Sequence, residues 1–190
     1  MRIVSQNVFN YGLEFQENFI LRINLAWCDS VSALTQILET HKNKKIFLDL
    51  PVGRIKPPNN KYSFDDLLPI LIKHKQIKYL AISNVETANH IIPYSSKIPN
   101  EITIVPKIES PTAVINIANI VASIPGNEKI IMLDHDDLFS NLQRSNENKE
   151  KFSDYIEKLQ NLCLKNNVTL LRTIGVIFSD EEKRVSDYVG

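Results

Sequence analysis

The chain has 190 residues, and its 22 Lys and Arg balance its 22 Asp and Glu. This length allows one sizeable hydrophobic core, so we expect a single domain over residues 1–190, although a complete eight-stranded β/α barrel usually needs about 250 residues. A formal net charge of zero provides no overall field for nucleic acid or an anionic membrane, and neither is an expected partner.

The N-terminal residues and the cysteines predict a cytoplasmic protein. The N-terminus lacks the basic start and unbroken apolar run of a signal peptide, and no segment of the sequence approaches the roughly 20 apolar residues of a membrane span. Cys28 and Cys163 lie far apart without neighbours at metal-ligand spacing. That usage fits a reducing compartment and predicts no disulfide framework.

Short β-branched runs alternate along the chain with longer segments of helical period, which predicts parallel strands joined by helices. Helix starts are predicted after Ser30 and Ser63, and one helix from Pro111 is predicted to end at Gly126. A last, amphipathic helix is predicted over 147–165. The seven predicted strands span residues 2–8, 19–26, 45–50, 77–82, 101–106, 129–134 and 168–174. The predicted fold class is α/β, a TIM-barrel-like (β/α) barrel that is incomplete, with about seven parallel strands.

Polar residues follow most of the predicted strands, at the end of a parallel sheet where ligands bind. Side chains two apart on a strand share a face, so Arg22 with Asn24, and Lys107 with Glu109, are predicted to form two pairs. A lysine beside a carboxylate suits an anionic substrate held together with a hard cation. We therefore predict that Glu109 and Asp137 share one Mg²⁺. The other polar residues at strand ends are Asp49, Asp134, His135, Asp136, Arg172 and Thr173.

A purely structural interpretation exists for each group. Lys107 and Glu109 could pair only with each other or with Asp49. The acidic run at 134–137 could be a solvated loop or a helix cap. A single histidine, His135, is a weak acid–base signal, and His74 is expected at the surface.

Six motifs in chain order resemble those of pyruvate kinase, over residues of about 19 to 178. They are LRINLA, LDLPVGRIK, YSFDDLLPILIKHKQIKYLAISNVETA, IVPKIESPTAV, IIMLDHDDL and VTLLRTIGV. The resemblance implies a barrel that binds phosphoenolpyruvate or pyruvate, a small oxyacid, together with ADP or ATP.

The resemblance also implies roles for individual residues. Arg22 would bind the transferring phosphoryl group, Lys107 would neutralise the phosphoryl and enolate oxygens, and Thr173 would lie beside the carbon that is protonated. Glu109 and Asp137 would bind Mg²⁺. Asn24 and Asp49 would bind K⁺. Such chemistry depends on positioning and charge neutralisation rather than on covalent help from the protein.

The sequence departs from the family in several places. Lys56 is followed by a short loop where pyruvate kinases insert a lid domain. Asp136 replaces a glycine where the substrate carboxylate would be received, which adds a repelling charge and a side chain to a special backbone. Ala26 replaces a hydroxyl ligand of K⁺. The fourth strand lacks an expected arginine, and no eighth βα unit follows residue 174.

An open barrel leaves unpaired strand edges, which we expect the N-terminal segment, the C-terminal tail or a second copy of the chain to cover. A second copy of the chain, in a homo-oligomer, is therefore one expected partner. Three functions stay open. The chain could be a pyruvate-kinase-like phosphotransferase whose activity is reduced or lost. It could be a metal-dependent lyase of the citrate-lyase or 2-keto-acid aldolase type, or a non-catalytic degenerate barrel that binds a metabolite or a partner.

Overall fold

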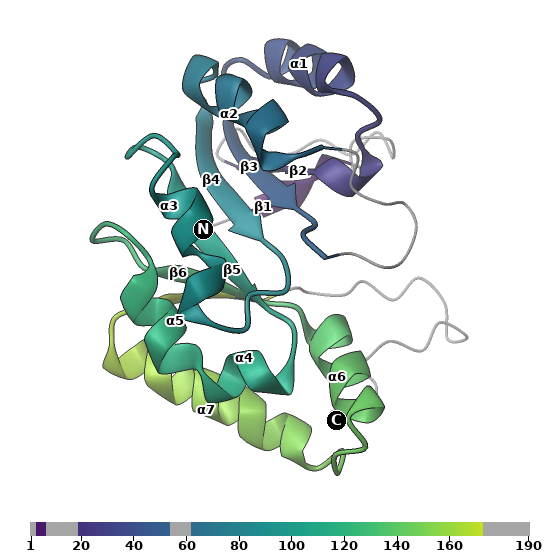
Figure 1. The fold of residues 1–190 in the computed structure, drawn as a ribbon, viewed down its shortest axis with the longest axis vertical. Coiled ribbons are helices and arrows are strands. Elements are labelled where there is room, and N and C mark those ends of the chain that lie inside the picture. Colours follow the sequence, from purple (N-terminus) through teal and green to yellow (C-terminus); the bar gives the residue numbers. More distant parts are fainter. Residues whose placement is uncertain (1–2, 7–18, 54–61, 173–190) are drawn as a thin grey trace. The chain divides into compact units, whose positions relative to one another are not determined.

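A computed structural model describes residues 3–6, 19–53 and 62–172 of the chain (Figure 1). The chain divides into two compact units. Unit 1 comprises Met1–Ser83 and Pro93–Ile104, and unit 2 comprises Asn84–Ile92 and Val105–Gly190. Thr173 and the segment of the third-strand motif from residue 54 onward lie outside the described residues.

All seven predicted strands are present, and their order in the sheet follows the order of the chain, β1-β2-β3-β4-β5-β6-β7. The strand pairs within each unit are parallel. This confirms the α/β class and agrees with an incomplete β/α barrel. The strands are β1 (Ile3–Ser5), β2 (Ile20–Asn24), β3 (Lys45–Leu50), β4 (Ile77–Ile82), β5 (Thr103–Ile108), β6 (Ile130–Leu133) and β7 (Thr169–Arg172). The fifth strand extends two residues beyond its predicted end, so Lys107 lies within β5.

The predicted helices are present, with two corrections, and α3 and α6 are additional to them. The helices and 3-10 turns are η2 (Leu25–Trp27), α1 (Val31–Thr40), α2 (Phe64–Lys73), η3 (Ala88–His90), α3 (Ile92–Ser95), α4 (Pro111–Ile115), α5 (Ile117–Ser123), α6 (His135–Arg144) and α7 (Lys151–Lys165). The predicted single helix from Pro111 divides at Asn116, whose backbone (φ −90°, ψ 7°) leaves the helical region. The predicted helix over 147–165 begins at Lys151.

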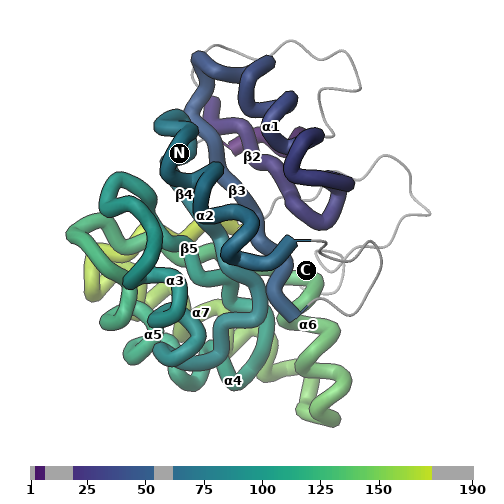
Figure 2. Tube along the Cα trace, turned by 45° about the horizontal axis from the view of Figure 1, so that its top comes forward, coloured from purple at the N-terminus to yellow at the C-terminus, as the bar shows by residue number. Residues whose placement is uncertain are grey.

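In unit 1, β1 to β4 form a parallel sheet, and α1 and α2 lie side by side on one face of it (Figures 1 and 2). The predicted helix starts are confirmed, because the Ser30 side chain accepts a hydrogen bond from the Ala33 N–H, and Ser63 forms a capping box with Asp66. The prediction that His74 lies at the surface is wrong. Its ring is buried, with Nδ1 4.0 Å from Glu39 of α1, because the end of α2 is covered by the neighbouring helix.

In unit 2, α4 and α5 connect β5 to β6, and α6 and α7 connect β6 to β7 (Figure 1). α4 contacts both α6 and α7. The predicted amphipathic face of α7 is confirmed, since Phe152, Ile156, Leu159 and Cys163 are buried. Phe152 packs edge-to-face on Phe139 of α6, with 5.3 Å between ring centroids.

The strand interiors are apolar, and the exceptions lie where strands end. Among the described residues, the buried polar or charged ones are Asp49, His74, Ser83, Lys107 and Glu109. All except His74 lie at or just beyond the carboxyl end of a strand. Buried charges are costly unless they are paired or bind a ligand, so these strand ends are the candidate location of a functional site.

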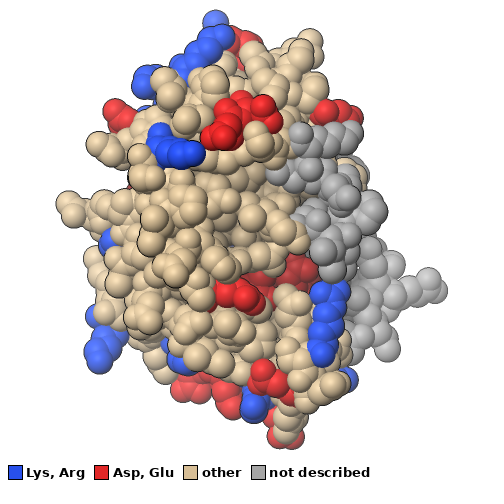
Figure 3. Space-filling view, in the orientation of Figure 1, with Lys and Arg blue, Asp and Glu red and all other residues tan. Residues whose placement is uncertain are grey.

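No described helix combines the length and the apolar character that a membrane crossing requires. On the face in Figure 3, the Lys and Arg side chains are scattered and form no continuous basic patch.

Candidate functional site

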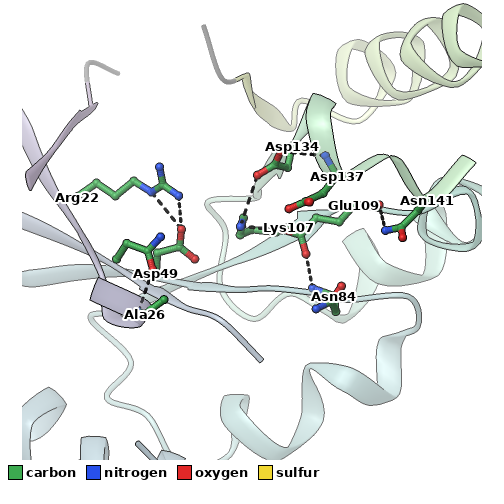
Figure 4. Close-up of polar contacts among 10 residues, drawn as sticks. Arg22, Ala26, Asp49, Asn84, Lys107, Glu109, Asp134, Asp137 and Asn141 are labelled. Atoms are coloured by element: carbon green, nitrogen blue, oxygen red, sulfur yellow. Dashed lines mark hydrogen bonds and ion pairs between the residues drawn. The ribbon is translucent and has the colours of Figure 1, made fainter. Parts of the chain in front are cut away.

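Three carboxylates of unit 2, from Glu109, Asp134 and Asp137, converge at the carboxyl ends of β5 and β6. One oxygen from each lies within 4.8 Å of the other two, which is close enough for one ion to bridge them (Figure 4). The sheet register explains this arrangement. Ile108 pairs with Leu133, so the residues immediately after them, Glu109 and Asp134, leave neighbouring strands together. We call these three residues the carboxylate cluster.

Lys107 provides a positive charge beside the carboxylate cluster. Its Nζ lies 2.7 Å from Oε1 of Glu109 and 3.7 Å from Oδ2 of Asp134, and its side chain is only 7% exposed. The pair expected from the two-residue spacing of Lys107 and Glu109 is therefore present. The metal-site prediction and the simpler ion-pair interpretation both describe this contact, and they differ only in whether the cluster also binds a cation.

Glu109 is held from three directions. The backbone N–H of Asn84 donates to its Oε2 at 2.6 Å, Lys107 contacts Oε1, and the side-chain amide of Asn141 donates to its main-chain carbonyl at 2.7 Å (Figure 4). Burial raises the pKa of the Glu109 carboxyl, and the nearby Asp134 adds to this, while Lys107 and the Asn84 N–H act in the opposite direction. A positive charge beside Glu109 therefore stabilises the ionised form of its buried carboxyl.

The acidic run at 134–137 has two roles in the structure. Asp134 caps α6, because its Oδ1 accepts a hydrogen bond from the Asp137 N–H at 3.3 Å, while its other oxygen faces Lys107. The helix-cap interpretation is therefore confirmed for Asp134, which also belongs to the carboxylate cluster. The sequence prediction missed Asp134 as a third possible ligand. The sequence did carry a signal for Asp134 as a ligand, because this aspartate directly follows a buried strand. Ligands bind at the carboxyl ends of such strands.

Asp136 lies exposed in the first turn of α6. The sequence predicted that an aspartate in place of glycine would strain the backbone at this position, and that prediction is wrong. The described non-glycine residues with positive φ are Asn84, Asn146 and Asn167, so Asp136 has ordinary helical geometry. A contact between Asp136 and a substrate stays a prediction.

His135 contacts Arg172, at the end of β7. The Arg172 guanidinium donates to Nε2 of His135 from Nε at 3.2 Å and from a terminal nitrogen at 3.1 Å. Burial lowers the pKa of His135, and the Arg172 charge lowers it further. A neutral imidazole that accepts from arginine is the consistent state, so His135 carries no added positive charge beside the cluster.

The other predicted site residues belong to unit 1. The Arg22 guanidinium donates to Oδ2 of Asp49 from Nε at 3.1 Å and also from a terminal nitrogen; Asp49 is 1% exposed. Asn24 has a different partner, because its Oδ1 accepts a hydrogen bond from the Ala26 N–H at 3.0 Å and caps the turn η2. Arg22 therefore pairs with Asp49 and not with Asn24.

Comparison with known proteins identifies the fold and no more. The sequence matches no protein-family model and no curated protein. The chain resembles the crystal structure of RipC from Yersinia pestis, with a TM-score of 0.60 and 15% sequence identity, over 85% of this chain and 72% of that one. At this identity the likeness concerns the arrangement of the backbone alone.

Proposed function

We propose that the chain binds one Mg²⁺ through Glu109, Asp134 and Asp137, and that it uses this ion and Lys107 to hold a small oxyacid of the phosphoenolpyruvate or pyruvate kind. The observation that carries the proposal is the convergence of three carboxylates within 4.8 Å beside a buried lysine. Carboxylate oxygens are the ligands that Mg²⁺ prefers, and the ion usually leaves several of its positions to water and substrate.

The charges support a divalent ion. The carboxylate cluster carries three negative charges when ionised and Lys107 carries one positive charge, which leaves two negative charges for a cation to neutralise. When bound, Mg²⁺ would supply charge neutralisation at the substrate oxygens. Lys107 lies close enough to the cluster to contact the same anion, since its Nζ is within 3.7 Å of both Glu109 and Asp134.

Phosphoryl transfer, the reaction of the pyruvate kinase family, is the first activity that we propose for this site. Arg22 and Thr173 would act on the phosphoryl group and the enolate carbon, and these roles depend on the sequence resemblance alone. K⁺ binding by Asn24 and Asp49 depends on the sequence resemblance alone and stays a prediction; Oδ1 of Asn24 also accepts a hydrogen bond from the Ala26 N–H.

A lidless lyase of the citrate-lyase or 2-keto-acid aldolase type is a second candidate. One observation favours it. β3 ends at Leu50 and α2 begins at Phe64, so the connection between them is too short for the domain that covers a pyruvate kinase site. Phosphoryl transfer to a nucleotide benefits from excluding water, whereas the same cation and lysine could stabilise an enolate without such a lid.

Calorimetric titration of the purified chain with Mg²⁺, and then with oxalate as an oxyacid probe, tests the proposal. We expect Mg²⁺ to bind, and oxalate to bind only when Mg²⁺ is present. Glu109→Gln and Asp137→Asn should each weaken Mg²⁺ binding strongly, whereas Glu157→Gln, at an exposed position on α7, should not.

Activity assays then separate the candidates. Pyruvate formed from phosphoenolpyruvate and ADP indicates the kinase, and cleavage of a 2-keto acid without nucleotide indicates the lyase. Ligand binding without turnover indicates a non-catalytic binding protein. A folded chain that binds neither Mg²⁺ nor oxalate would refute the proposed site.

A further inference from the structure

Asn141 connects the two parts of the carboxylate cluster. It lies on α6, the helix that Asp134 caps and whose first turn carries Asp137. Asp137 and Asn141 are four residues apart and so share a face of the helix. From that face the Nδ2 of Asn141 donates to the main-chain carbonyl of Glu109 at 2.7 Å (Figure 4). A single side chain thus connects the helix that carries two carboxylates to the residue that carries the third.

The amide of Asn141 has a defined orientation. Its Oδ1 accepts a hydrogen bond from a terminal nitrogen of Arg144 at 3.2 Å, one turn further along α6. With the oxygen engaged there, the Nδ2 is the atom directed at Glu109. Arg144 therefore favours the rotamer in which Asn141 is a donor to the carbonyl.

The remaining contacts of Glu109 come from other elements. Lys107 belongs to β5, and Asn84 lies just after β4, so these two fix the carboxylate group relative to the strands. The hydrogen bond from Asn141 acts instead on the backbone of Glu109 relative to α6. The β5–β6 register already holds Asp134 beside Glu109, so it is the distance between Glu109 and Asp137, the carboxylate within α6, that depends on this hydrogen bond.

We propose that Asn141 is a positioning residue that sets the spacing of the carboxylate cluster and, through that spacing, its preference for Mg²⁺ over Ca²⁺. The inference rests on the proposed cation site and deepens it. Mg²⁺ demands near-octahedral geometry with ligands at about 2.0–2.1 Å, whereas Ca²⁺ accepts flexible geometry at about 2.3–2.6 Å. If α6 is free to move away from Glu109, the carboxylate cluster should lose more affinity for Mg²⁺, the smaller ion, than for Ca²⁺.

Calorimetric titrations of four variants with Mg²⁺ and with Ca²⁺ test the inference. Asn141→Leu removes the donor in a side chain of similar shape, and Asn141→Ser removes the amide and leaves a hydroxyl on a shorter side chain, without adding an apolar group. Asn141→Gln retains an amide. The matched control is Asn166→Leu, because Asn166 makes the same kind of bond, from its Nδ2 to the Leu162 carbonyl at 2.8 Å, at the exposed end of α7.

We expect Asn141→Leu and Asn141→Ser to weaken Mg²⁺ binding by about tenfold or more, as is usual when a residue that orients a metal ligand is removed. The loss for Ca²⁺ should be clearly smaller, Asn141→Gln should lose less than either, and Asn166→Leu should change neither affinity. Thermal unfolding of each variant shows whether it is folded. The serine variant decides the question if the leucine variant does not fold.

Two results would overturn the inference. Equal losses for both ions, or no loss, in a folded Asn141 variant would mean that the hydrogen bond serves the fold only, while the proposed cation site would stand. An unsubstituted chain that binds no divalent cation would remove the proposed function and this inference with it.

Discussion

Replacing Lys107 with methionine isolates the charge that balances the carboxylate cluster. Methionine retains most of the apolar side chain but lacks the ammonium group. In the variant, Glu109, with a side chain only 4% exposed, would lose its ion-pair partner, and the neighbouring Asp134 would repel its ionised form.

The structure sets the size of the expected effect. Two unit charges 2.7 Å apart attract each other by about 6 kcal/mol at an effective dielectric constant of about 20. Part of that attraction only offsets the cost of removing both groups from water. Breaking a buried pair by removing one partner typically costs about 3–5 kcal/mol, and we expect Lys107→Met to lower the free energy of unfolding by that amount.

Urea unfolding at pH 7 with EDTA, followed by circular dichroism, measures this cost. Lys151→Met is the matched control, because Lys151 pairs with Glu147 at 3.2 Å on the exposed surface of unit 2, where an ion pair contributes little. A double variant, Lys107→Met with Glu109→Gln, should be more stable than Lys107→Met alone, since it leaves no unpaired charge at Glu109.

The cost of Lys107→Met should also depend on pH. The pKa of the Glu109 carboxyl is already raised by burial, and losing Lys107 removes an interaction that lowers it. Between the unfolded pKa of about 4.5 and the raised folded value, the folded state holds a proton that the unfolded chain has released. Stability therefore falls as pH rises through this interval, so the deficit should be smaller at pH 5 than at pH 7. A cost no larger than that of Lys151→Met, or a cost independent of pH, would refute the reasoning.

Three other predictions concern single elements of the fold. Ser30→Ala should lower the free energy of unfolding by about 1 kcal/mol in urea titrations, since Ser30 caps α1, and an unchanged value would contradict the cap. Asn84 has a φ of 55°, so Asn84→Gly should be tolerated while Asn84→Val should cost about 1–2 kcal/mol more; equal stabilities would refute this. Burial raises the pKa of the Cys163 thiol from 9.0 to about 11. Its alkylation at pH 8, followed by mass spectrometry, should therefore be at least about a hundredfold slower than in urea-unfolded chain, and comparable rates would be inconsistent with this burial.

The fold could be predicted from the sequence because both signals of an α/β protein are local. Runs such as KIFLDL are apolar on both faces, and in the structure five of its six residues are buried. A serine directly before a segment with the apolar periodicity of a helix indicated where α1 begins, and likewise where α2 begins. The break at Asn116 was not visible, because asparagine within a helical period is ordinary and its side chain donates to the main-chain carbonyl of Glu86, 30 positions away.

The charged part of the site could also be predicted, but its supporting contacts could not. Lys107 and Glu109 are two residues apart on a strand, which fixes their common face. The Asn84 contact uses a backbone N–H and joins residues 25 positions apart. The Asn141 contact joins residues 32 positions apart. Neither the side-chain type nor the spacing along the sequence gives a signal for such contacts.

The balance of charges in the carboxylate cluster also predicts how a cation would affect the whole chain. Lys107 compensates part of the negative charge, and α6 presents its N-terminus to Asp134 and Asp137, where the helix dipole favours anions. These carboxylates can therefore lie together in a metal-free chain, so folding should not require the ion. Mg²⁺ at 100 times its dissociation constant should then raise the free energy of unfolding by about 2.7 kcal/mol and leave the circular dichroism spectrum of the folded chain unchanged. A chain that is unfolded in EDTA and folds only when Mg²⁺ is added would show instead that Lys107 is an insufficient counter-charge.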